Sequence, residues 1–179
     1  MYGIINVAIQ DYAVENYGPE NWEAIKQQSG LDIDYSLTDS PYNDTIPYAI
    51  AKAAATVMQL NFEEVLSGIG ESIIPTTNKK FNSFIDSRGD TLKDYLINLP
   101  NFHNRIAMIY PELTPPQFRV SNVGSNSMHV HYFTTTKGIV PFVNGYLKGL
   151  VSMFNDQAGV VFLQSIEDGN FQEIFKISW

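Results

Sequence analysis

Three histidines and a short row of hydroxyl side chains are the residues whose types and spacing could bind a ligand. The first histidine, His103, lies among apolar residues at helical spacing: Leu96, Leu99, Phe102 and Ile106. Residues three, four and seven apart share one helix face. Burying an imidazole there without a partner costs on the order of 1–3 kcal/mol. That partner can be a backbone carbonyl, another side chain or a metal, and a satisfied core histidine is the simplest interpretation.

The other two histidines, His129 and His131, are two positions apart in a segment that alternates like a β-strand. Both therefore point to one face of the strand. Together with His103 they could form a three-histidine zinc set, as in a zinc hydrolase. The residues between them look core-facing, which favours the alternative that both histidines face solvent on the outer side of an antiparallel sheet.

Hydroxyl side chains alternate at the end of the same segment, at Tyr132, Thr134 and Thr136, and Lys137 follows directly. Hydroxyl donors and a cation suit an oxyanion such as a carboxylate or a phosphate. Tyrosine and threonine are also favoured strand residues, so this row has a plain structural explanation as well.

The elements that position these residues begin with helices over residues 2–17, 19–29, 49–60 and from 61 onward. Proline inside a helix costs about 3 kcal/mol. We therefore expect an interruption at Pro75, and a separate helix that begins near Pro100, carries His103 and ends at about Tyr110.

The hydrophobic period changes to two after Pro116, which predicts strands over residues 118–120 and 128–134 joined by a turn at 124–127. A helix over 139–154 and strands over 160–166 and 171–177 follow. The sequence thus predicts an α+β fold in a single domain, residues 1–179. It has a helical amino-terminal lobe (about 1–62) and a lobe (about 63–179) with a four-stranded antiparallel sheet plus helices.

Composition limits the function classes. The 179 residues carry a net charge of −8, which argues against nucleic acid and anionic membrane surfaces as partners. There are no cysteines, so disulfides and thiolate ligands are excluded. No stretch approaches the ~18 apolar residues of a transmembrane helix, and the amino terminus does not look like a secretory leader. We expect a soluble, cytoplasmic protein.

These motifs together resemble the H-NOX (haem–nitric oxide/oxygen binding) family, which includes the sensor domain of soluble guanylate cyclase. The similarity extends from Met-Tyr-Gly at the start through Asn21-Trp-Glu-Ala-Ile-Lys26 to the final hairpin. The helix with the family's haem-ligating histidine falls on Asn98-Leu-Pro-Asn-Phe-His103. The proline that distorts the porphyrin falls on Pro116. The Tyr-x-Ser-x-Arg motif that clamps the haem propionates falls on Tyr132-Phe-Thr-Thr-Thr136.

The resemblance implies haem b as the cofactor, with His103 as the iron ligand. Tyr132 and Thr134 would contact the propionates, but Thr136 stands where the family has arginine, and a hydroxyl cannot replace its bidentate pairing with a carboxylate. Lys137 could serve as a point charge. The distal tyrosine that donates to O2 in some members is replaced by Pro141 or Phe142, and the distal tryptophan of others by Ile73. Ile5, Ile73, Ile74 and Phe142 would form an apolar distal wall.

The implied function is a gas sensor, not an enzyme, that binds nitric oxide and CO and discriminates against O2. Family behaviour implies that nitric oxide breaks or lengthens the bond between iron and His103, and that the haem relaxes against Pro116. A signalling partner such as a histidine kinase or diguanylate cyclase would respond in trans. The alternatives are the zinc hydrolase on His103, His129 and His131, and a haem-free family member that binds another apolar carboxylate.

Overall fold

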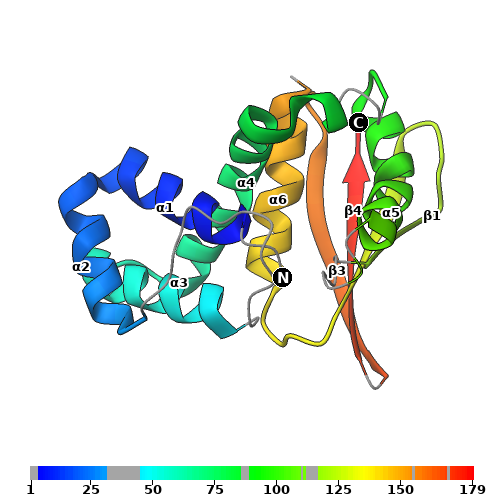
Figure 1. The fold of residues 1–179 in the computed structure, drawn as a ribbon. Helices are drawn as coiled ribbons and strands as arrows, with labels where there is room; N and C mark the ends of the chain where they lie inside the picture. The colour runs from blue at the N-terminus through cyan, green and yellow to red at the C-terminus, as the bar shows by residue number, and fades with distance from the viewer. Residues whose placement is uncertain are drawn as a thin grey trace.

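A computed structural model of the chain describes residues 4–31, 45–85, 89–109, 111, 117–154, 156–168 and 170–179. Ten elements follow in chain order: α1 (Ile4–Tyr17), α2 (Pro19–Ser29), α3 (Thr45–Met58), α4 (Phe62–Ile85), α5 (Leu92–Ile109), β1 (Gln117–Ser121), β2 (Ser127–Thr134), α6 (Val140–Met153), β3 (Gly159–Asp168) and β4 (Asn170–Ser178). Helices α1–α3 lie on one side, the sheet and α5 on the other, and α4 and α6 between them (Figure 1). The predicted α+β fold is confirmed.

The second helix shows how local sequence sets the boundaries. Pro19 occupies its first turn, where a missing N–H costs nothing, and Gly30 ends it in the left-handed conformation at φ 63°. Gly30 donates its backbone N–H to the carbonyl of Gln27. Trp22 and Ile25 face the core, as predicted.

The two proline positions do not behave as predicted. Helix α4 continues through Pro75 and α5 continues through Pro100, so the expected interruption at Pro75 and the separate helix for His103 are both wrong. Apolar residues are buried in the turns that lead up to each proline, which favours an unbroken helix: Ile69, Ile73 and Ile74 in α4, and Leu96 and Leu99 in α5. Beyond Pro75, the Thr76 hydroxyl donates to Asp11 Oδ2 of α1 at 2.8 Å, which stabilises the continued helix.

The sheet has the strand order β1-β2-β4-β3, with every neighbouring pair antiparallel. Its register gives two distinct faces. Phe118, Val130 and Phe175 are buried on the core face, and Tyr132 lies on the same face. The predicted turn between β1 and β2 closes through the Gly124 N–H, which donates to the Ser127 carbonyl at 2.9 Å.

Helices α4 and α6 cross at very short range, which glycines make possible. A Cβ on Gly145 would lie 1.9 Å from the Ser67 carbonyl oxygen, and one on Gly70 would lie 2.1 Å from the Phe142 carbonyl oxygen. Both obstacles are backbone atoms, which cannot rotate away. The crossing therefore holds Phe142 of α6 against α4.

Replacing Gly145 with alanine is expected to destabilise the protein by about 1–3 kcal/mol, the usual range for overpacking. The loss should appear although alanine is the better helix former. The free energy of unfolding in denaturant measures it. Gly124→Ala is the matched control, since its Cβ would meet the Ser127 oxygen at an ordinary 3.5 Å. Equal stability of the two variants would contradict the close crossing.

Candidate haem site

Helix α5 carries His103. Its first turn is capped by Thr91, whose hydroxyl oxygen accepts the Asp94 backbone N–H at 3.1 Å while its O–H donates to the Asp94 carboxylate at 2.6 Å. The buried stripe Leu92, Tyr95, Leu96 and Leu99 fixes the face that α5 turns toward the core. His103 lies one turn beyond Leu99, on the same side of the helix.

Aromatic rings surround the imidazole of His103. Phe118 of β1 stacks on it, with ring centroids 5.3 Å apart and an interplanar angle of 28°. Phe102 approaches edge-on, at 5.3 Å and 78°. The residue is half-buried, and its Nδ1 atom is fully buried. An imidazole binds a metal ion through a ring nitrogen in its neutral form.

Of the three predicted hydroxyl residues, Tyr132 and Thr134 lie in strand β2, whereas Thr136 lies beyond its end. Tyr132 is buried on the core face, with its ring 5.1 Å from that of Phe118. Thr134 ends β2, and its hydroxyl oxygen accepts the Thr136 backbone N–H at 2.9 Å. Thr136 therefore follows a turn after the strand, so the predicted alternation stops at Thr134. Lys137 is exposed to solvent.

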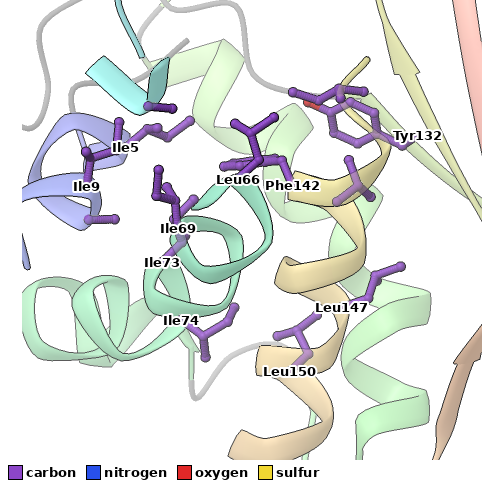
Figure 2. Close-up of a cluster of buried hydrophobic side chains, with 14 of the residues drawn as sticks. Ile5, Ile9, Leu66, Ile69, Ile73, Ile74, Tyr132, Phe142, Leu147 and Leu150 are labelled. Atoms are coloured by element: carbon purple, nitrogen blue, oxygen red, sulfur yellow. The ribbon is translucent and has the colours of Figure 1, made fainter. Parts of the chain in front are cut away.

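An apolar cavity lies where α1, α3, α4 and α6 meet. It is small, with room for about one water molecule, and is lined by Ile5, Ile9, Tyr48, Leu66, Ile69, Ile139 and Phe142. Figure 2 shows Ile5 and Ile9 of α1 near Leu66 and Ile69 of α4, with Phe142 of α6 beyond them.

The sequence predicted part of this cavity wall. Ile5 and Phe142 line the cavity, whereas Ile73 is buried one turn beyond the lining residue Ile69. The sequence did not predict Tyr48 as a lining residue. The one signal for this role was its position at the start of a helix that packs against α1. Pro116 lies outside the described residues.

His103 and the cavity are connected along α6. Phe142 lines the cavity, and Tyr146 follows one turn later on the same helix. The ring of Tyr146 lies 5.9 Å from that of Phe118, which in turn stacks on His103. The predicted ligand His103, the buried Tyr132 and Tyr146 of the cavity-lining helix α6 thus meet around Phe118.

The two remaining histidines lie on the outer face of the sheet. Gln172 Nε2 donates to His131 Nδ1 at 2.7 Å, which leaves His131 Nε2 as the donor to Ser121 Oγ, also at 2.7 Å. Burial, together with the nearby His129 and Arg119, lowers the pKa of His131, so its ring is neutral near pH 7.

This arrangement does not favour a zinc site. His103 stacks on Phe118 of the core face, whereas His129 and His131 alternate with the core-facing residues of β2. Among the described residues, no three His, Cys, Asp or Glu side chains gather closely enough to hold a metal ion.

Within the same part of the chain, no helix is both long and apolar enough to cross a membrane.

The residues fit a haem in most respects. The imidazole of His103 lies on the core side as a candidate iron ligand, α6 carries both Tyr146, which contacts Phe118, and the cavity-lining Phe142, and β2 supplies the hydroxyl groups of Tyr132 and Thr134. The poorer match to a haem is at the residues that would bind its propionates, because Thr136 offers a hydroxyl where the family motif has a cation. This combination of fold and side chains is compatible with a haem-binding domain of the α+β class.

Comparisons with known proteins agree with that class. The sequence profile of the haem-NO-binding family matches residues 2–162, and the chain belongs to this family, H-NOX. Soluble guanylate cyclase gcy-31 of Caenorhabditis elegans is 25% identical over 176 residues, which cover 97% of this chain and 25% of the relative. The chain thus spans about a quarter of that cyclase's length.

Solved structures show the same fold. A doubly substituted variant of the Tt H-NOX domain superimposes with a TM-score of 0.88 at 19% identity, over 100% of this chain and 95% of that one. An oxygen-binding H-NOX domain, solved as its oxygen complex, gives a TM-score of 0.81 at 18% identity, over 99% and 94% of the two chains. Because this family consists of sensor domains, the prediction that the domain is not an enzyme is confirmed.

Proposed function

We propose that this domain binds haem b through His103 and senses nitric oxide and CO at the ferrous iron while discriminating against O2. The observation that supports it best is the half-buried imidazole of His103, set between the rings of Phe102 and Phe118. Haem supplies an iron that takes up diatomic gases. His103 would hold the iron from one side, and Tyr132 and Thr134 would bind the propionates.

Discrimination against O2 follows from the apolar cavity. Bound O2 is stabilised by a hydrogen-bond donor, whereas nitric oxide and CO bind ferrous iron without one. Six of the seven lining side chains are hydrocarbon only, and Tyr48 alone among them carries a hydroxyl. A second polar group, Asn6, is fully buried on α1 beside Ile5 but is not a lining residue. An iron that faces this cavity would therefore favour the gases that need no donor.

We propose that signalling starts at His103. His103 would hold the iron, and loss of that hold when nitric oxide binds would leave α5, which packs on β1, free to shift. A partner such as a histidine kinase or a diguanylate cyclase would read that shift in trans, in the cytoplasm. Because α5 runs unbroken through Pro100, the whole helix would move as one body.

The propionate edge gives a direct prediction. Thr136→Arg restores the cation of the family motif and is expected to slow haem loss about tenfold or more, since hydrogen bonds to charged groups contribute about 1.5–3 kcal/mol. Transfer of haem to a competing haem-binding protein measures the rate. Thr135→Arg, at an exposed neighbouring position, adds the same charge as a control. Equal rates in both variants would mean that position 136 does not face a propionate.

Reconstitution tests the proposal as a whole. Purified protein should take up haemin in a 1:1 ratio, with iron in metal analysis and a strong Soret band. Colourless protein that contains zinc would support the hydrolase alternative. Colourless, metal-free protein that ignores haemin would support a family member that binds another apolar carboxylate.

A further inference from the structure

Phe118 is the residue at which three parts of the haem site meet. It lies on edge strand β1 and is 9% exposed. Its ring contacts His103 of α5, Tyr132 of β2 and Tyr146 of α6, with centroid distances of 5.3, 5.1 and 5.9 Å. In the sequence, Phe118 stands out only as an apolar residue of a predicted strand.

The three contacts differ in geometry. Phe118 lies nearly parallel to the imidazole, at 28°, whereas it meets Tyr132 edge-on, at 73°. A parallel neighbour restricts rotation of the imidazole about its Cβ–Cγ bond, because turning the ring would drive its edge into the Phe118 face. Phe102 comes from the same helix as His103 and touches it edge-on, so it restrains this rotation less.

We propose that Phe118 is a positioning residue for the haem ligand: its ring sets the rotation of the His103 imidazole and couples that rotation to Tyr132 and to the sheet. This inference rests on the proposed role of His103. With haem bound, the orientation of this imidazole would affect the strength of its bond to the iron. A movement of β1 would reach His103 through Phe118.

The contact itself can be tested on the haem-loaded full chain. The ferrous CO complex is diamagnetic, so nuclear Overhauser effects between the Phe118 ring protons and the His103 ring protons should be observed by NMR. Their absence in a protein whose iron is ligated by His103 would overturn the inference and leave the proposed function intact. A protein in which His103 does not bind iron would overturn both.

The effect on the ligand can be measured by resonance Raman spectroscopy of the ferrous protein. Phe118→Leu keeps an apolar side chain but removes the stack, so the iron–histidine stretching band should shift and broaden as the imidazole samples more rotations. Phe118→Tyr keeps the ring and should retain the wild-type band. This second variant separates loss of stacking from a folding defect.

Phe133→Leu is the matched control, because Phe133 lies in the same sheet and alternates with Tyr132 to the opposite face. It removes an aromatic ring without touching His103, and its band should match that of the wild type. An unchanged band in Phe118→Leu, or equal changes in Phe118→Leu and Phe133→Leu, would overturn the inference.

Discussion

Haem binding should be lost when His103 is replaced by glycine, and free imidazole should restore it. The substitution removes the only side chain that we assign to the iron, so the loss of affinity should exceed the 10–100-fold that removing an outer partner of a metal ligand typically costs. Glycine also leaves space beside Phe118, where added imidazole can enter and bind the iron. Absorption spectra of the reconstituted protein, with and without imidazole, measure both effects.

The matched control is His131→Gln. His131 lies on the outer face of the sheet, where both of its ring nitrogens have hydrogen-bond partners, so its loss should leave the Soret band unchanged. A His103→Gly variant with the wild-type spectrum and haem affinity would show that another residue holds the iron. Loss of haem in both variants would point to a general effect on folding.

A hydroxyl placed on the cavity wall should let the protein bind O2. Phe142 lines the cavity and is 8% exposed, so Phe142→Tyr adds a donor in apolar surroundings. A hydrogen bond to a charged or strongly polar acceptor contributes about 1.5–3 kcal/mol, which corresponds to about a 10- to 150-fold gain in O2 affinity. Nitric oxide affinity should change much less. Equilibrium O2 titration of the reduced protein measures the gain.

Two further variants test the cavity wall. Phe162→Tyr adds the same hydroxyl on β3, where Phe162 is 39% exposed, and should have no effect on O2 binding. Tyr48→Phe removes the hydroxyl that already belongs to a lining residue, and should leave gas binding unchanged if that group does not reach the ligand. An unmodified protein that binds O2, and loses it in Tyr48→Phe, would identify Tyr48 as a distal donor and contradict the proposed discrimination.

Much of the fold was predictable because local signals agreed with long-range packing. The Pro19 and Gly30 boundaries of α2 and the alternation of β2 are local rules that the tertiary structure keeps. Pro75 and Pro100 are the exceptions, since the cost of a helical proline is local but the apolar burial that offsets it comes from other elements. Sequence spacing alone cannot show whether the cost of the proline or the stabilisation from apolar burial is larger.

The site was predictable in its candidate ligand and less so in its surroundings. His103 stood out because a titratable ring lies on an apolar helix face. Its partner Phe118 could not be found, because the contact joins α5 to β1 across a segment whose path the sequence does not reveal. Tyr48 comes to the cavity from α3 for a similar reason. Thr136 departs from the family motif, which shows that a motif match indicates a site without fixing its geometry.

The most direct test is the absorption spectrum of the reduced, haem-loaded protein, recorded first under argon, then in air and finally with nitric oxide. We expect no change in the Soret band on brief exposure to air, and a distinct shift with nitric oxide. Formation of a stable O2 complex in air, or failure of nitric oxide to shift the band, would contradict the assignment of this domain as a nitric oxide sensor that discriminates against O2.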